Sequence, residues 1–127
     1  MAQNSRYACV VKVKTTFLAD QSNPDESKFA FAYTVTITNT GSVPAQLISR
    51  HWIITNAHQE SQEVKGLGVI GEQPLLAPNE HYEYTSGTLI TTATGEMRGS
   101  YQMVAEDGTL FEAIIEPFPL YQHRVLH

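Results

Sequence analysis

The chain has 127 residues, 42% of them hydrophobic, which is enough for one domain with its own core. Its net charge of −5, with acidic and basic residues scattered, disfavours sequence-independent binding to DNA or RNA phosphates. The single cysteine, Cys9, excludes an internal disulfide and a multi-cysteine zinc site. Without a signal-peptide core or a run of roughly 20 apolar residues, the sequence predicts a soluble cytoplasmic protein.

Two segments in the first third of the chain alternate with period two, which is typical of half-buried strands. The first covers residues 7–17. In the second, residues 29–38, one face is aromatic and aliphatic and the other is small or hydroxylated. The polar residues 20–27 between them predict a mobile loop, and Asn39-Thr40-Gly41-Ser42 predicts a turn after the second strand.

Residues 45–55 carry apolar side chains at both odd and even positions, which predicts a central strand. Trp52 is expected in the core, where its indole N–H needs a hydrogen-bond partner. Residues 56–59 predict a hairpin tip that leads into a strand at 62–65.

The second half of the chain continues in short strands. After the glycine-rich stretch we expect a loop that contains Pro74 and Pro78. Strands are then expected at 81–86, near 90, at 97–104 and at 110–115. A turn at Glu106-Asp107-Gly108 should join the last two. An Asp-Gly pair between apolar alternations is a strong hairpin signal. Pro117 and Pro119 are expected to end the last strand.

No window shows sustained helical periodicity, so the chain is predicted to be an all-β sandwich of two antiparallel sheets. We expect one domain, residues 1–127, with flexible tails at about 1–5 and 122–127.

The glycines Gly66, Gly68 and Gly71 form a GxGxxG pattern, which is found in dinucleotide-binding folds. That function requires a helix directly after the glycines, because the helix N-terminus binds the pyrophosphate. Pro74 and Pro78 leave no room for such a helix. The context therefore excludes a Rossmann fingerprint, and no lysine and hydroxyl follow as in a P-loop.

Two interpretations of the glycines remain. Their backbone N–H groups could form a phosphate-binding nest without a helix, with Lys65 as the nearest cation. Alternatively, they relieve steric conflict at a turn or bulge in a sheet, which is the commoner role.

Other chemistry-bearing residues form no motif. The histidines are His51, His58, His81, His123 and His127, and no HExxH or Cys/His cluster occurs. Cys9 lies on an apolar strand face, where cysteine is typically inert. The pairs Glu60/Glu63 and Glu106/Asp107 fall in predicted loops and tips. The aromatic strand faces suggest core rather than base-stacking platforms. We expect no enzyme, no metal site and no cofactor.

Four segments together resemble the ApaG family, also named CorD: RHWIITN at 50–56, VKGLGVIGEQP at 64–74, YTSG at 84–87 and GEMRGSYQM at 95–103. The resemblance covers essentially the whole chain. It implies a fibronectin type III/immunoglobulin-like β-sandwich.

The resemblance also implies a function. Bacterial members are linked to cobalt resistance and magnesium efflux, and eukaryotic relatives carry the domain in proteins with a supposed protein-interaction role. The expectation is therefore a non-enzymatic adaptor that binds an unidentified protein partner, or a homo-oligomer. The alternative is a module for phosphate, pyrophosphate or a nucleotide that uses the Gly66–Gly71 loop, because the family's glycine motif has been proposed to bind such ligands.

Overall fold

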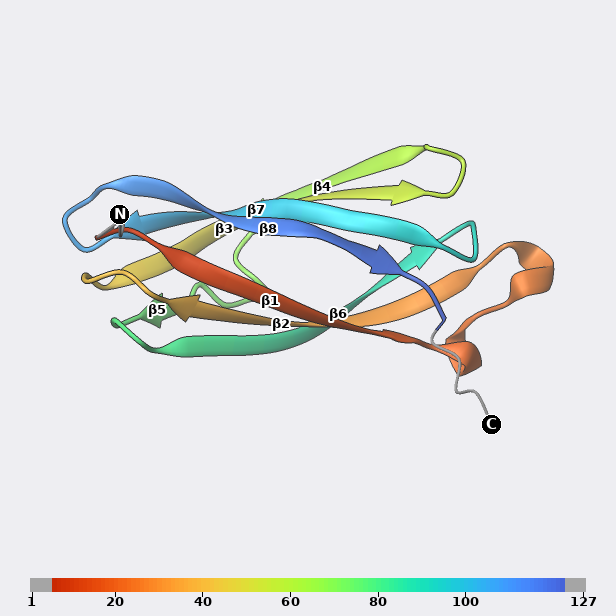
Figure 1. Ribbon diagram of the computed structural model, residues 1–127, viewed down its shortest axis with the longest axis horizontal. Helices are drawn as coiled ribbons and strands as arrows, with labels where there is room; N and C mark the ends of the chain where they lie inside the picture. Colours follow the sequence, from red (N-terminus) through yellow and green to blue (C-terminus); the bar gives the residue numbers. More distant parts are fainter. Residues whose placement is uncertain (1–5, 123–127) are drawn as a thin grey trace, which may run out of the picture.

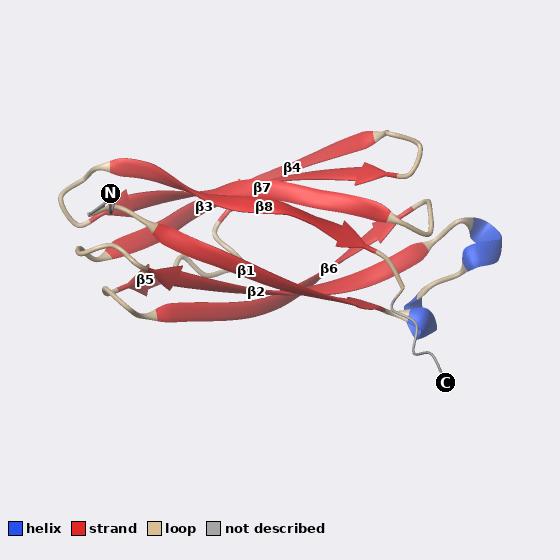
Figure 2. Cartoon of the chain, viewed as in Figure 1, coloured by secondary structure: helices blue, strands red, loops and turns tan. Residues whose placement is uncertain are grey.

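The computed structural model describes residues 6–122, which form two antiparallel sheets packed face to face (Figures 1 and 2). The predicted all-β sandwich is confirmed. None of these residues lies in an α-helix, and none of them belongs to a helix long and apolar enough to cross a membrane. The tails predicted at about 1–5 and 122–127, with His123 and His127, lie outside the described residues except for residue 122.

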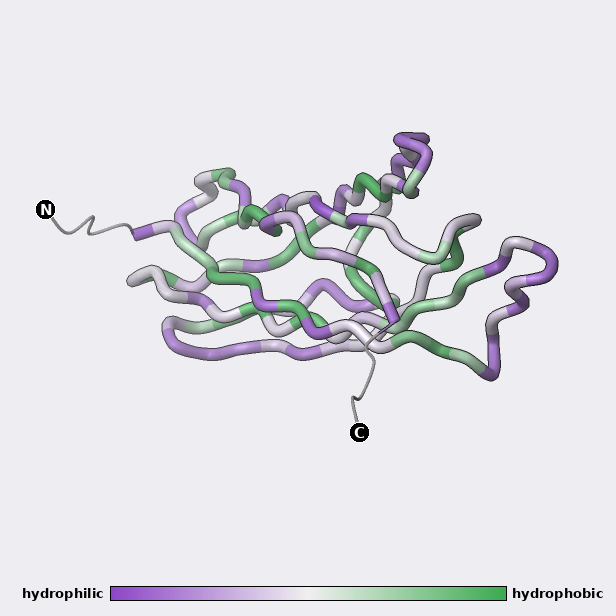
Figure 3. Tube along the Cα trace, turned by 45° about the vertical axis from the view of Figure 1, so that its right-hand side comes forward, coloured by the Kyte–Doolittle hydropathy of each residue, from purple (hydrophilic) through white to green (hydrophobic). Residues whose placement is uncertain are grey.

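The first sheet has the order β1-β2-β6, with β1 at Cys9–Phe17, β2 at Phe29–Asn39 and β6 at His81–Ile90. The alternation predicted for β2 decides which face is inside. Phe31, Tyr33, Val35 and Ile37 are buried, while the threonines between them are half-exposed. Figure 3 shows how hydrophobic and hydrophilic residues are distributed along the chain.

The second sheet has the order β4-β3-β7-β8, and its strands are Ser61–Leu67 (β4), Ala45–Asn56 (β3), Gly95–Ala105 (β7) and Leu110–Leu120 (β8). A two-residue strand, β5 (Leu75–Leu76), pairs with β3 at Ala45 and Gln46, beyond the end of β4. β5 lies inside the segment predicted to be only a loop, because the prolines on either side of it leave two residues free to pair.

A β-bulge at Ile48 explains why β3 is apolar at both odd and even positions. The register with β7 shifts between Leu47 and Ser49. Odd-numbered residues of β3 therefore point into the sandwich before the bulge, and even-numbered residues point into it after the bulge. Leu47 and Trp52 are therefore both buried, although an odd number of residues separates them. After the bulge, the inward residues are Arg50, Trp52 and Ile54.

Two predictions about loops are wrong. β8 continues through Pro117 and Pro119 to Leu120, which it can do because it is an edge strand whose outer side needs no backbone donor. The polar segment after β1 is not plain loop but two 3₁₀ turns, η1 (Ala19–Gln21) and η2 (Pro24–Glu26).

The predicted aromatic faces lie in the core. Trp52 is 2% exposed and its ring contacts Tyr33, Tyr101 and Phe118 at 5.3–6.2 Å between centroids. The hydroxyls of Tyr84 on β6 and Tyr101 on β7 form a 2.5 Å hydrogen bond that joins the two sheets. Burial raises the pKa of Tyr84 to about 12 and raises that of Tyr101 further.

The prediction that the Trp52 indole has a hydrogen-bond partner is wrong. Its Nε1 is buried and has no acceptor among residues 6–122. The ring packs against the rings of Tyr33, Tyr101 and Phe118.

Candidate functional site

The glycine-rich stretch continues from β4 into a two-residue hairpin at residues 69–72. Val69 and Glu72 exchange two backbone hydrogen bonds of 2.8 Å. The central residues both have positive φ, 42° at Ile70 and 81° at Gly71, as a type I′ turn requires. Gly71 is therefore a turn glycine, while Ile70 is a β-branched residue in a strained conformation.

Gly66 and Gly68 are required by close contacts. Gly68 has φ 63°, and a Cβ there would lie 2.4 Å from the carbonyl oxygen of Glu72. Gly66 lies opposite Arg50 in the register of β3 and β4, and its Cβ would lie 2.7 Å from Arg50 Nη2. The three glycines are thus explained by a tight turn at Gly71 and by close contacts of the backbone at Gly66 and Gly68.

Arg50 fixes the loop to the sheet. Its Nη1 donates to the carbonyls of Leu67 and Gly68, at 3.0 and 2.8 Å. Sequence analysis missed this role. The signal that could have found it is an arginine two residues before Trp52 on the same strand face, directly ahead of a glycine-rich partner strand.

The structure also shows which of the loop's N–H groups are available to a ligand. Those of Gly68, Val69 and Glu72 donate to backbone carbonyls. Within residues 6–122, the N–H groups of Ile70 and Gly71 have no such acceptor. Lys65 is exposed on the outer face of β4. The phosphate hypothesis therefore stays a prediction that rests on two N–H groups at the turn.

The outer face of the second sheet brings together residues that the sequence analysis treated separately. The strand registers align them in three rows: Leu75, Gln46, Val104 and Leu110; Leu67, Ser49, Gln102 and Glu112; and Lys65, His51, Ser100 and Ile114. Residues opposite each other in an antiparallel pair point to the same face. One continuous surface results, called here the outer face.

Apolar side chains occupy the border of the outer face. Leu67 is 75% exposed, Leu75 64%, Leu110 79% and Ile114 55%. Single exposed aliphatic residues are ordinary, but four on one sheet face are typical of an interaction surface.

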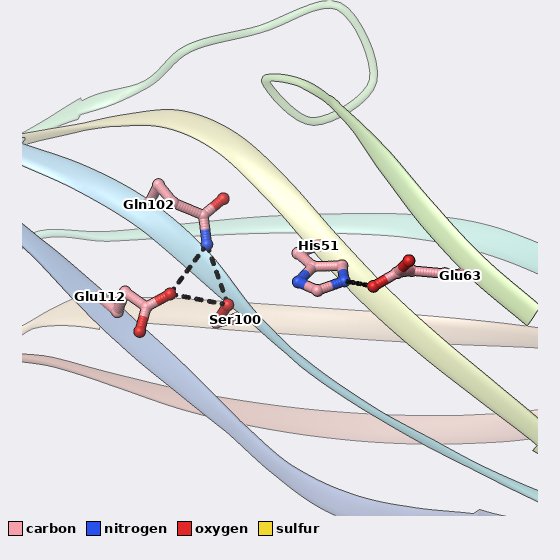
Figure 4. A network of polar contacts seen from close by, with 5 residues as sticks. All are labelled: His51, Glu63, Ser100, Gln102 and Glu112. Carbon is pink, nitrogen blue, oxygen red and sulfur yellow. Dashed lines mark hydrogen bonds and ion pairs between the residues drawn. The ribbon is translucent and has the colours of Figure 1, made fainter.

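Polar side chains occupy its centre and are bonded to one another. Ser49 Oγ donates to Gln102 Oε1 at 2.7 Å, and Gln102 Nε2 donates to Ser100 Oγ at 2.9 Å and to Glu112 Oε2 at 3.3 Å. Figure 4 shows Ser100, Gln102 and Glu112 of this group and, beside them, His51, whose Nε2 lies 2.5 Å from Glu63 Oε2. The centre is therefore an ordered set of donors and acceptors.

The outer face is hollowed beside β4. The hollow has a volume of about 500 Å³ and is lined by Ser49, Arg50, His51, Lys65, Gly66, Leu67, Gln102 and Glu112. It joins the polar centre to Leu67 and to the arginine that holds the glycine loop. The glycine loop and the outer face thus form one region of the molecule.

The remaining candidates do not gather into a site. His58 lies in the β3–β4 turn and His81 at the start of β6, away from His51 in the fold. Within residues 6–122, no three His, Cys, Asp or Glu side chains are placed to hold a metal ion. Burial raises the pKa of Cys9 to about 11, so its thiol is protonated and weakly nucleophilic at neutral pH. Glu60, Glu106 and Asp107 lie exposed at turns.

Comparison with known proteins gives the family. The family model described as the ApaG domain matches residues 19–105, which include β2 to β7 and the whole glycine loop. The chain belongs to the ApaG domain family. Protein ApaG of Methylobacillus flagellatus is 58% identical over 127 residues, which is the full length of both chains. Protein ApaG of Thiobacillus denitrificans is 57% identical over the same span.

The solved structures agree with the ApaG fold described above. The crystal structure of the ApaA protein from Bordetella pertussis is similar to this chain with a TM-score of 0.92 and 51% sequence identity, covering 97% of this chain and 100% of that one. The sandwich is therefore the family's fold.

Proposed function

We propose that this protein is a non-enzymatic binding domain that docks a protein partner on its outer face. The observation that carries the proposal is that Leu67, Leu75, Leu110 and Ile114 stand exposed at the ends of the three register rows, around an ordered polar centre. Exposed aliphatic groups lose little conformational entropy when they are buried and gain about 25 cal/mol per Å² of apolar surface removed from water.

The polar centre makes this surface selective. Gln102, Ser100 and Glu112 hold one another in fixed orientations, so a partner must match their remaining donors and acceptors. Burying such groups unmatched costs free energy, which disfavours wrong partners.

We further propose that the partner is cytoplasmic and that the cobalt and magnesium phenotypes implied by the family resemblance act through it. In this account the domain recognises a component of a cation-handling system and performs no chemistry itself. What supports this is the outer face, where exposed aliphatic side chains surround a hydrogen-bonded polar centre, and a Cys9 thiol that is protonated at neutral pH and so a weak nucleophile.

Affinity capture from the native cell extract tests the proposal. The double variant Leu67→Ser, Leu110→Ser removes two apolar groups at opposite sides of the outer face. The control Val10→Ser alters an apolar side chain that is 45% exposed on the other sheet. A partner captured by the wild type and by Val10→Ser, but lost with the double variant, supports the proposal. Equal capture by all three proteins contradicts it.

A phosphate- or nucleotide-binding function is the second candidate. The observation in its favour is that the N–H groups of Ile70 and Gly71 are consecutive, unpaired within residues 6–122 and exposed at a turn. Calorimetry with pyrophosphate and ATP tests it, with Lys65→Gln as the variant and Lys12→Gln on β1 as the control. Binding that weakens only in Lys65→Gln supports this function, and no heat at millimolar ligand refutes it.

A further inference from the structure

A second hollow lies on the outer face next to the one beside β4. Its volume is about 280 Å³, and its mostly apolar wall includes Ile53, Ile114 and Pro117. His51 belongs to the walls of both hollows, so the two adjoin and form one groove, which extends from Lys65 on β4 to Pro117 on β8. Because the groove lies open across four strands of a sheet, it fits a polypeptide segment better than an enclosed small molecule.

The free charges of the groove are positive, although the protein has a net charge of −5. Lys65 lines the first hollow and Arg98 the second, and neither side chain forms an ion pair or a hydrogen bond with any of residues 6–122. Glu112 is the only carboxylate among the described residues of the two walls, and it already accepts a hydrogen bond from Gln102. Glu63, beside the groove, is paired with the shared histidine. A fitting segment is therefore both apolar and acidic.

The strand registers give the spacing of the two free cations. Lys65 pairs with His51, and Arg98 pairs with Ile53, two residues further along β3. With about 4.8 Å between neighbouring strands and about 3.4 Å per residue, the Cα atoms of Lys65 and Arg98 lie roughly 12 Å apart. Residues i and i+4 of an extended peptide are separated by about 13 Å and point to the same side. Residue i+2, between them, then lies over His51 and Ile53.

We propose that the partner docked on the outer face contributes an extended segment with acidic residues at i and i+4 and apolar residues at i+2 and i+6. The inference rests on the proposed function and adds the chemistry of the partner. The carboxylates pair with Lys65 and Arg98. Residue i+2 packs on Ile53, and residue i+6 reaches Ile114 and Pro117. The apolar contacts supply most of the affinity, and the two ion pairs, exposed at the surface, select the partner by its charge.

Titration of the ¹⁵N-labelled full chain with a synthetic peptide tests the proposal. The probe is the end-blocked heptapeptide Glu-Ser-Leu-Ser-Glu-Ser-Leu, which has glutamates at i and i+4 and leucines at i+2 and i+6. Three matched peptides carry glutamine at both glutamate positions, lysine at both, or serine at both leucine positions. The expected result is a saturable shift of the amide signals of β3 and β7 around His51, Ile53 and Ser100. Binding of the acidic peptide is expected to be about fivefold tighter than that of each matched peptide.

Two variants remove the cations one at a time. Lys65→Gln and Arg98→Gln are each expected to weaken binding of the acidic peptide about two- to threefold, and to leave binding of the glutamine peptide unchanged. Lys12→Gln, exposed on β1 of the other sheet, is the matched control and is expected to bind as the wild type does. Signal dispersion equal to that of the wild type shows that the variants are folded.

Four results overturn the proposal: no shift at millimolar acidic peptide, equal binding of the acidic and lysine peptides, shifts confined to the first sheet, or unchanged binding in both Lys65→Gln and Arg98→Gln. If a partner is captured from extract through Leu67 and Leu110 while the acidic peptide does not bind, the docking function stands and only this assignment of the partner's chemistry fails. Equal capture by all three proteins of the capture experiment contradicts the docking function, and this inference with it.

Discussion

Arg50 and Gly66 face each other across β3 and β4, and the guanidinium occupies the space that a side chain on Gly66 would need. The same guanidinium binds the carbonyls of Leu67 and Gly68 and so fixes the start of the glycine loop. The first glycine of the motif therefore makes room for an arginine, and the arginine orders the loop.

This relationship predicts that Gly66→Ala and Arg50→Lys destabilise the protein through one shared contact. Each is expected to lower the free energy of unfolding by about 1–2 kcal/mol, because hydrogen bonds from the charged group are weakened or lost. Denaturant unfolding measures both. The double variant should lose clearly less than the sum of the two single losses. Additive losses would mean that Arg50 and Gly66 act independently.

The second and third glycines should differ in their tolerance of alanine. Both have positive φ, so each Gly→Ala change carries a strain of about 1 kcal/mol. Only at Gly68 does the new Cβ also meet a backbone oxygen, that of Glu72 at 2.4 Å. Gly68→Ala is therefore expected to cost about 1–3 kcal/mol more than Gly71→Ala in the same unfolding assay. Equal costs would contradict the type I′ hairpin and its packing.

The Tyr84–Tyr101 hydrogen bond should behave as one coupled unit. Tyr84→Phe or Tyr101→Phe leaves one buried hydroxyl unpaired, which costs about 1–3 kcal/mol. The double Phe variant removes both hydroxyls and should cost less than the sum of the single changes. A double-mutant cycle by thermal or denaturant unfolding measures this coupling, and a coupling energy near zero would show that the bond contributes nothing.

Two buried acidic groups, the thiol of Cys9 and the hydroxyl of Tyr84, predict a loss of stability at alkaline pH. Burial raises the folded-state pKa of Cys9 from 9.0 to about 11 and that of Tyr84 from 10.0 to about 12. The unfolded chain releases these protons first, so the free energy of unfolding falls as the pH rises from about 9 to 12. Denaturant midpoints at pH 8, 10 and 11.5 test this. In the Tyr84→Phe, Tyr101→Phe variant the part of the fall above pH 10 should be smaller, and an unchanged slope would contradict the assignment.

The sandwich was predictable because strand alternation is a local signal. The period-two pattern of Phe29 to Thr38 and the Asp107-Gly108 turn place β2 and the β7–β8 hairpin without knowledge of the partner strands. Pro117 and Pro119 misled the prediction of β8, because only the sheet order shows that β8 is an edge strand.

The candidate site was much less predictable, because it depends on register. Leu75 is far in the sequence from Val104 and Leu110, and the three fall into one row only once the pairings of β3 with β5, β3 with β7 and β7 with β8 are known. The glycine pattern drew attention to the right region. That Arg50 orders the glycine loop, however, could be predicted only by knowing which face of β3 points into the sandwich.

The central claim, that the outer face docks a protein, is tested most directly by site-specific photo-crosslinking in living cells. A photoreactive side chain is placed at Leu67, at Leu110 or, as the control, at Val10 on the other sheet. The account predicts one adduct of the same mass from positions 67 and 110 and none from position 10. Adducts from all three positions alike, or from position 10 alone, would contradict it.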